Sequence, residues 1–332
     1  AFSGSGKPMN RYLQDLTVRL AIGAAELPAE VRQRHRDYFC GKQESCGGFA
    51  GREGPSDAYY TSFGLRALAI LGELHGERAE RAAEFLKMKL QGQESWVDFF
   101  SLIYGSSLLK VSAGIDIFEG QGGWETRIAE FLETLRRDDG GYAKSAEGAA
   151  SSTYQSFLVC IALNLLEKEI PKLANLQRFV LGQQGEDGGF REIRAAKRSG
   201  TNPTAAALGT LQILGNRDAD VHDGVIDFLL ERQDSEGGLT ANSRIPICDV
   251  LSTFTGMVTL LDLKALFELD LEAVHRFIRS LQQPEGGFLA ATWDEKVDVE
   301  YSFYGLGCLS LLEYHKIHGD AGEQELGSTD QG

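Results

Sequence analysis

Three carboxylates, Asp249, Asp298 and Glu300, are candidates for acid chemistry or cation binding in this 332-residue chain. They are related by an internal sequence repeat with a step of 49 residues. That step places Asp249 in register with Asp298, and Leu251 in register with Glu300. Equivalent positions of stacked units lie at the same end of the stack, so we expect Asp249, Asp298 and Glu300 to cluster there. Three carboxylates could chelate a hard cation such as Mg2+ and, through it, a diphosphate.

The same residues also have a structural interpretation. Asp249 and Asp298 stand where helices should begin and could cap them by accepting backbone N–H bonds. Glu300 falls one turn inside an otherwise apolar helix, where an unpaired acid is costly to bury. A carboxyl among aromatic rings would have a raised pKa and could act as a general acid, with the hydroxyl of Tyr301 beside it. These four residues are the catalytic candidates, and aromatic faces near them could stabilise a carbocation.

Pairs of glycines followed by a large apolar side chain mark the repeated unit. The last four copies begin at residues 140, 188, 237 and 286, which gives steps of 48, 49 and 49 residues. The first copy begins at residue 47, and the gap of 93 residues to the next is close to two steps. A degenerate copy is therefore expected near Gln91–Trp96. Glycine supplies the positive φ that a chain reversal needs at a helix end, and a fixed period of this length predicts stacked supersecondary units.

Two kinds of helix alternate along these units. Before each glycine pair, apolar residues recur at spacings of three and four, which is typical of a half-exposed helix. After each pair, the helix has almost no charged face, as in Ala205–Leu214, Val250–Leu263 and Tyr301–Leu312. A helix that is apolar on all sides must be covered on all sides or line an apolar cavity. No strand alternation of useful length competes with this pattern.

We therefore predict an all-α fold in which inner and outer helices form a closed barrel, an α/α toroid, with a central apolar cavity. An open solenoid with polar caps is the alternative. Aromatic residues near one end of the apolar helices favour the closed ring, because together they would line a deep pocket. Those expected to bind an apolar ligand are Tyr60, Tyr154, Phe254, Phe303 and Tyr304.

Composition excludes several classes of protein. The net charge of −15 argues against a nucleic-acid partner. The five cysteines are scattered without a Cys-x-x-Cys pattern, which fits a reducing, cytoplasmic compartment. No apolar run is long enough for a membrane span. We expect one domain of about six helix pairs over residues 9–318, after a cloning remnant at residues 1–8 and before a polar tail at residues 319–332.

From Gln43 to about Glu313, the Gln-x-x-x-Gly-Gly-Phe period resembles the β subunits of protein farnesyl- and geranylgeranyltransferases. These belong to the prenyltransferase and squalene cyclase α/α-toroid superfamily. The resemblance implies a central cavity that holds an isoprenoid chain. It also implies a zinc ion held by Asp, Cys and His, which activates a substrate thiolate. The β subunits of that family work with a helical-repeat α subunit, so a separate α-type partner or self-association is open here.

This chain departs from the family's zinc motifs. Their aspartate is kept as Asp249, but Leu251 stands at the cysteine position and Tyr301 at the histidine position. Leucine cannot ligate zinc, and tyrosine does so rarely. We therefore expect the zinc site to be absent, which leaves Asp249 as the one metal-ligand candidate from the motif.

The family grips its diphosphate with basic side chains. Arg244, five residues before Asp249, lies close to a family arginine, and Lys197 and Arg198 could add charge from the same rim. The alternative interpretation is that these are solvated loop cations.

Three functions remain open from the sequence. The preferred hypothesis is an enzyme related to prenyltransferases that binds an isoprenoid diphosphate and transfers or rearranges it. The second is a cyclase of linear polyprenyl chains started by a carboxylic acid, for which Glu300 or Asp298 would be responsible. The third is a non-catalytic toroid that carries a polyprenyl lipid or docks a protein partner.

Overall fold

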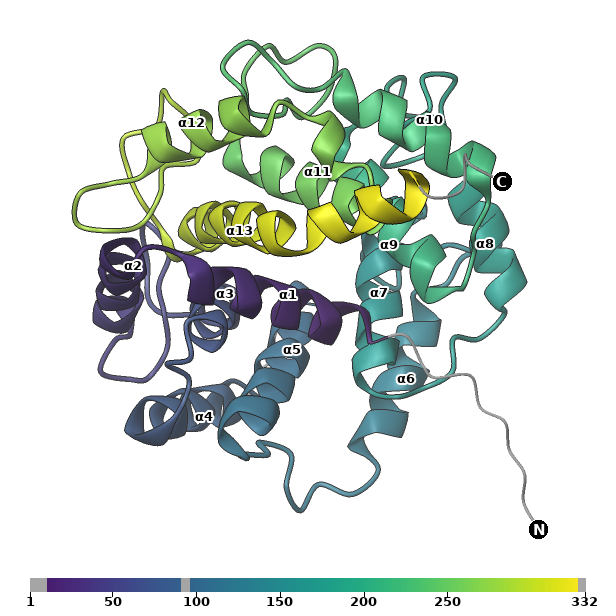
Figure 1. The fold of residues 1–332 in the computed structure, drawn as a ribbon. Coiled ribbons are helices and arrows are strands. Elements are labelled where there is room, and N and C mark those ends of the chain that lie inside the picture. The colour runs from purple at the N-terminus through teal and green to yellow at the C-terminus, as the bar shows by residue number, and fades with distance from the viewer. Residues whose placement is uncertain (1–10, 91–95, 328–332) are drawn as a thin grey trace.

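The computed structural model describes residues 11–90 and 96–327, and within them the elements are helices connected by loops with isolated β-bridges. Most helices form two concentric rings (Figure 1). The outer ring consists of α2 (Ala29–Lys42), α4 (Gly76–Leu90), α6 (Trp124–Thr134), α8 (Leu173–Leu181), α10 (Ala219–Leu230) and α12 (Leu271–Leu281). The inner ring consists of α3 (Ala58–Ile70), α5 (Trp96–Ala113), α7 (Thr153–Leu165), α9 (Thr201–Ile213), α11 (Val250–Asp262) and α13 (Val299–Gly327). A short 3-10 turn, Leu266–Glu268, precedes α12.

The glycine pairs position each loop against the next outer helix. Gly188 has φ +80°, and a Cβ placed there would lie 2.1 Å from the carbonyl oxygen of Gly224 on α10. A Cβ on Gly189 would lie 2.7 Å from the ring of Phe228 on the same helix. Both positions therefore need glycine, the first for its conformation as well as for space. This is why the pair recurs wherever a loop docks onto an outer helix.

The residue after each glycine pair fixes the loop to the following inner helix. Phe190 is fully buried, and its backbone N–H donates a 2.8 Å hydrogen bond to the hydroxyl of Thr204, one turn inside α9. A hydroxyl at this place satisfies a buried donor that would otherwise be unpaired. The other four loops repeat the bond from Phe49 to Thr61, Tyr142 to Ser156, Leu239 to Thr253 and Phe288 to Ser302.

The last repeat packs on the first, so the barrel is closed. Inner helix α13 contacts α3 as well as α11. The loop at Gly286 docks on α2, where a Cβ would lie 2.8 Å from the carbonyl oxygen of Arg34. The closed barrel predicted from the sequence is confirmed, and the open solenoid is wrong for this chain.

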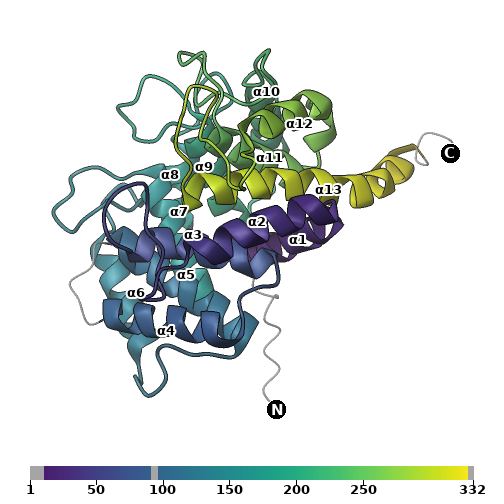
Figure 2. The same cartoon turned by 90° about the vertical axis from the view of Figure 1, so that its left-hand side faces the viewer.

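Helix α1 (Tyr12–Glu26) belongs to neither ring and closes one end of the barrel. In Figure 2, the loops that lead into the inner helices lie on the left, and α1 lies at the other end beside α13. The contact is close, because a Cβ on Gly23 would lie 1.8 Å from the carbonyl oxygen of Ser310 on α13. Arg19 of α1 also forms a 2.5 Å ion pair with Asp262 at the end of α11.

Before the first glycine pair the structure has two helices, α1 and α2, with Pro28 between them. At the other end, α13 continues to Gly327, into the segment expected to be a polar tail. Residues 1–8 and most of the degenerate copy expected at Gln91–Trp96 lie outside the described residues. No helix of the described part is both long and apolar enough to cross a bilayer.

Candidate functional site

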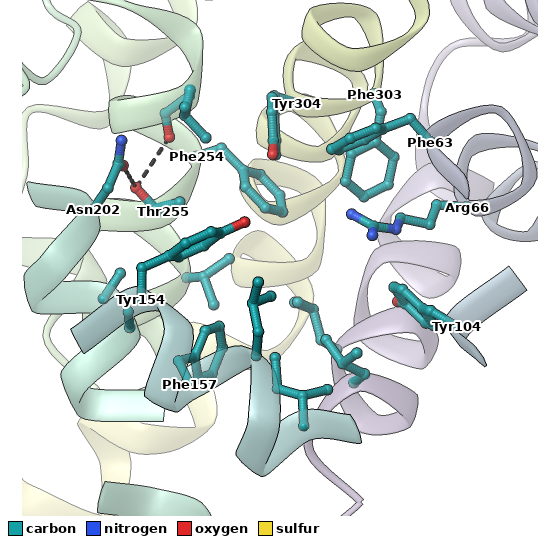
Figure 3. A pocket seen from close by; sticks show the side chains of 18 of the residues that line it. Phe63, Arg66, Tyr104, Tyr154, Phe157, Asn202, Phe254, Thr255, Phe303 and Tyr304 are labelled. Carbon is teal, nitrogen blue, oxygen red and sulfur yellow. Dashed lines mark hydrogen bonds between the residues drawn. The ribbon is translucent and has the colours of Figure 1, made fainter. Parts of the chain in front are cut away.

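A cavity of about 390 Å³ lies inside the inner ring, above α1. That volume falls within the range of small-molecule pockets, about 300–1,000 Å³. Its wall is mostly aliphatic and aromatic, and it receives side chains from α1 and from all six inner helices (Figure 3). The lining residues of α1 are Tyr12, Leu13, Leu16, Thr17 and Leu20.

Four aromatic rings pack against one another on one side of the cavity. Tyr304 lies 5.4 Å from Phe63, 5.3 Å from Phe254 and 5.6 Å from Phe303, measured between ring centroids. These edge-on and tilted contacts leave ring faces free to line the space. Phe254, Phe303 and Tyr304, together with Tyr154 on α7, are pocket-lining residues that the sequence singled out.

One arginine lies among these rings. The guanidinium of Arg66, in the middle of α3, lies over the rings of Phe63, Tyr104 and Phe303 at 4.4, 4.5 and 5.8 Å. Figure 3 shows it pointing into the cavity between Phe63 and Tyr104. Among the described residues that line the cavity, Arg66 is the one with a permanent positive charge. Arg244, Lys197 and Arg198, the basic residues expected at the rim, do not line it.

Glu300 lines the same cavity from the first turn of α13. Its carboxylate accepts a 2.7 Å hydrogen bond from the hydroxyl of Tyr59 on α3. Burial raises the pKa of Glu300 above its ordinary value, against the lowering effects of the Tyr59 hydroxyl and of Arg66. The buried acid that the sequence indicated is therefore present, and its proton is held to higher pH than in an exposed glutamate.

A second carboxyl, Glu192, comes from the loop before α9 and also lines the cavity. The hydroxyl of Ser152, at the start of α7, donates a hydrogen bond to it. The Glu192 carbonyl oxygen accepts a 2.9 Å bond from the backbone N–H of Thr153. Burial raises the pKa of Glu192 as well. Sequence reasoning missed this residue, because its neighbours in sequence are those of a polar loop.

Asp249 and Asp298 act as helix caps in the structure. One oxygen of Asp249 accepts a 2.7 Å bond from the backbone N–H of Ser252, and the other accepts a 2.8 Å bond from its hydroxyl. Asp298 accepts a 2.9 Å bond from the backbone N–H of Tyr301 and forms a 2.7 Å ion pair with Arg52. Neither aspartate lines the cavity.

Asp249, Asp298 and Glu300 lie at the same end of the barrel, where burial and the charges of all three raise the pKa of Tyr301, but they do not converge on one point. Each carboxylate is turned to a separate partner, and among the described side chains no group of three or more His, Cys, Asp or Glu residues is placed to hold a metal ion. The hypothesis of a three-carboxylate Mg2+ site at these residues is wrong for this geometry.

The donor set at the family's zinc positions does not fit zinc either. Both oxygens of Asp249 are used within its own helix, and Leu251 presents an aliphatic side chain to the cavity. Tyr301 lies beneath the Arg52 guanidinium, 5.4 Å from its ring centroid, and does not line the cavity.

The remaining predicted residues lie outside the cavity wall. Arg244, Lys197 and Arg198 are exposed on loops, and Arg198 donates a 3.2 Å hydrogen bond to the hydroxyl of Ser243. Tyr60 packs edge-on against Tyr59 at 5.2 Å but is turned away from the cavity wall.

A closed double ring of helices around an apolar cavity defines the α/α toroids. The family described as prenyltransferase alpha-alpha toroid domain matches residues 23–99, 124–244 and 207–327, well over half of the chain. The chain belongs to this family.

Similar proteins include the β subunit of geranylgeranyl transferase type-2 from Saccharomyces cerevisiae. It is 29% identical over 191 residues, which are 57% of this chain and 56% of that subunit. The match thus spans little more than half the length of that relative.

Two solved structures have the same fold. Protein geranylgeranyltransferase-I of Candida albicans, complexed with GGPP, matches with a TM-score of 0.64 and 15% identity, over 94% of this chain and 93% of that one. A variant of the type II terpene cyclase MstE from Scytonema, in complex with geranylgeranyl dihydroxybenzoate, matches with a TM-score of 0.59 and 15% identity, over 92% and 99%. At these identities the similarity shows the fold alone.

Proposed function

We propose that this chain binds an isoprenoid chain in its central cavity and acts on an isoprenoid diphosphate as a prenyltransferase. The observation that carries the proposal is the cavity itself, an aromatic-lined space inside a prenyltransferase-family toroid. Burying apolar surface contributes about 25 cal/mol per Å², so a long isoprenoid gains more here than a small polar ligand.

In this reaction, the bond between the first prenyl carbon and the diphosphate oxygen breaks, and the carbon joins a nucleophile on the acceptor. Diphosphate leaves, and the acceptor loses a proton. Glu300 is suited to take up that proton, because its raised pKa makes it a better base than an ordinary carboxylate once it is ionised. The aromatic walls exclude water, which would otherwise compete with the acceptor.

One observation favours a second function, a cyclase started by proton donation. Glu300 lies in the same cavity as several aromatic faces, and its raised pKa keeps its proton available to an alkene. Donating that proton would generate a carbocation that ring faces can stabilise.

The two functions differ in their products. We would incubate the protein with labelled farnesyl and geranylgeranyl diphosphate, with and without a mixture of thiol-bearing peptides. Release of diphosphate together with a labelled acceptor supports transfer, whereas a cyclised product that keeps its diphosphate supports the cyclase.

A cavity-filling variant gives the matching control. Ala205 lines the cavity from α9, and Ala205→Phe would place a ring in the space that the ligand needs. Binding of either diphosphate should be lost in that variant while its far-ultraviolet circular dichroism stays that of the parent. If the parent protein binds neither diphosphate, the proposed function is wrong.

A relative named as a subunit also suggests a partner. We include in the proposal a separate α-type subunit or self-association, which light scattering of the protein alone and after co-expression would distinguish.

A further inference from the structure

Arg66 is a charged side chain in a cavity wall that is otherwise mostly apolar. It stands one turn from Phe63 and one turn from Ile70 on α3, and both of those side chains line the same cavity. Its Nε atom is buried without a hydrogen-bond partner among the described residues. The surrounding rings of Phe63, Tyr104 and Phe303 stabilise the guanidinium by cation–π attraction and supply no negative charge.

The acids that line the cavity are already engaged. Glu300 accepts its hydrogen bond from Tyr59, and Glu192 accepts one from Ser152. Among the side chains that the structure describes, no carboxylate forms an ion pair with Arg66. The guanidinium is half-buried and faces the cavity, where it has no direct ion-pair partner among the residues described. A cation placed in this way gains from an anion brought into the cavity, because a charge-assisted hydrogen bond is stronger than a neutral one.

Two hydroxyls face the same space. Figure 3 shows Tyr154 of α7 and Arg66 of α3 pointing toward each other across the cavity, with the Tyr304 hydroxyl directed between them. Tyr154 exposes 43% of its surface although its ring lies inside the barrel, which is consistent with a side chain directed into an open space. A guanidinium and two hydroxyl donors converging on one space form a suitable site for carboxylate or phosphate oxygens.

The same charge acts against a carbocation. In a cyclase, neutral ring faces stabilise the developing cation. Here the faces of Phe63, Tyr104 and Phe303 already hold the positive charge of Arg66. A second positive charge at similar range would be repelled in this low-dielectric space.

We infer that Arg66, Tyr154 and Tyr304 form an internal subsite for the anionic head group of the isoprenoid ligand. The head group then lies inside the barrel, rather than at the rim beside Arg244, Lys197 and Arg198. The apolar chain occupies the remainder of the cavity toward the α1 floor, between Leu13, Leu16 and Leu20. This inference rests on the proposed function and adds to it the class and the orientation of the ligand.

The test compares three ligands with the same isoprenoid tail, at farnesyl and geranylgeranyl length. They are the neutral alcohol, the carboxylic acid and the diphosphate, and their affinities are measured by isothermal titration calorimetry. We expect the parent protein to bind the acid and the diphosphate at least tenfold more tightly than the alcohol. A charge-assisted hydrogen bond corresponds to about 10- to 100-fold in affinity. Whichever anion binds more tightly identifies the head group.

Variants test whether Arg66 and Tyr304 cause the preference for anionic ligands over the alcohol. Arg66→Gln should remove it, lowering affinity for both anions by about 10- to 100-fold while affinity for the alcohol is kept. Retained alcohol binding also shows that the variant folds. Tyr304→Phe should weaken the anions by a smaller factor. Arg217→Gln removes the same charge from an exposed loop between α9 and α10 and should change nothing.

Two results would overturn the inference while leaving the proposed function intact. One is equal affinity of the parent protein for alcohol and anions. The other is an anion preference that survives in Arg66→Gln but disappears when Arg244 is replaced by Gln, because that would place the head group at the rim. Failure of all three ligands to bind the parent protein would instead remove the proposed function.

Discussion

At the residue scale, the cavity combines a cation surrounded by aromatic rings with two carboxyls that other residues hold in place. Glu300 is bound by Tyr59 and Glu192 by Ser152, whereas the contacts described for Arg66 are with ring faces. Because burial raises the pKa of both acids, the charge inside the barrel changes with pH. A neutral Glu300 and a neutral Glu192 leave Arg66 as the dominant charge in the cavity.

Replacement of Glu300 by Gln should raise the free energy of unfolding at neutral pH and abolish turnover. In the parent protein, the raised pKa means that the folded state binds the proton more tightly than the unfolded state. The contribution of Glu300 to stability is therefore greatest below the ordinary glutamate pKa of about 4.3, and it is lost as pH rises through the raised pKa. Glu300→Gln removes that loss and keeps an oxygen that accepts from Tyr59.

We expect the variant to gain stability relative to the parent as pH rises from about 4.3 to neutrality, measured by urea unfolding at several pH values. Isoprenoid binding should be kept and turnover lost. A variant that turns over at the parent rate would show that Glu300 is not the proton-transferring group.

At the element scale, each inner helix is positioned by a small set of recurring contacts at its start. A glycine pair docks the loop on an outer helix, a buried side chain fixes the loop to the barrel, and a hydroxyl accepts its backbone N–H. Asp57, Ser152, Asp249 and Asp298 cap four of the inner helices by accepting backbone N–H bonds. Asp249 and Asp298, which the sequence suggested as catalytic residues, thus stabilise the starts of their helices.

Asp249 gives a direct test of that role. Asp249→Ala should lower the free energy of unfolding by about 1 kcal/mol, the usual effect of losing a cap. Asp249→Asn should have little effect on stability or on activity, because asparagine caps as well as aspartate. If asparagine abolished activity while stability stayed at the parent value, Asp249 would have a chemical role after all. Urea unfolding and the labelled-diphosphate assay measure the two quantities.

The docking glycines can be tested against a matched position. Gly54 has φ +87°, and no described atom lies within 4 Å of the place a Cβ would take, so Gly54→Ala carries only backbone strain, about 1–2 kcal/mol. Gly188→Ala adds a clash 2.1 Å from the Gly224 carbonyl oxygen and should lose about 2–5 kcal/mol in thermal or urea unfolding. Equal losses for the two variants would mean that the loop does not dock on α10 as described.

At the scale of the whole molecule, the barrel depends on the junction between its first and last repeats. His35 of α2 is fully buried there and stacks on Phe288 at 4.6 Å. Its Nδ1 atom accepts a 3.2 Å hydrogen bond from the backbone N–H of Gly287. At the same junction, Arg52 joins Asp294 and Asp298 by ion pairs.

This junction should fail in mild acid. Burial lowers the pKa of His35 from 6.5 to about 4, with the charges of Arg34 and Arg279 adding to the effect. The unfolded chain therefore takes up a proton that the folded chain resists, so this stability is present above pH 6.5 and is lost as pH falls toward 4. The contribution is about 3 kcal/mol over that window, since one pKa unit corresponds to about 1.4 kcal/mol.

His35→Asn tests whether His35 causes this acid sensitivity. The side-chain oxygen of asparagine can accept the Gly287 N–H bond in place of Nδ1, and asparagine does not titrate between pH 4 and 6.5. The variant should be less stable at neutral pH, having lost the ring contact with Phe288, and its unfolding free energy should change less between pH 6.5 and 4. An unchanged slope would assign the acid sensitivity to other groups.

The sequence by itself determined the architecture. Glycine pairs at a regular step, with amphipathic helices before them and apolar helices after them, predict repeated helical hairpins. The apolar, aromatic-bearing inner helices favour a closed ring over an open solenoid. The pocket-lining roles of Tyr154, Phe254, Phe303 and Tyr304 follow from the same pattern, as does the buried acid at Glu300.

The tertiary structure alone decided which polar residues meet in the cavity. Repeat register placed Asp249, Asp298 and Glu300 at one end of the barrel, but rotamers and local donors turned the two aspartates back onto their own helices. Arg66 was not singled out from the sequence, and two of its three ring contacts, with Tyr104 and Phe303, come from other helices and cannot be read from one segment. The floor made by α1 depends on a long-range contact with α13, which no local pattern encodes.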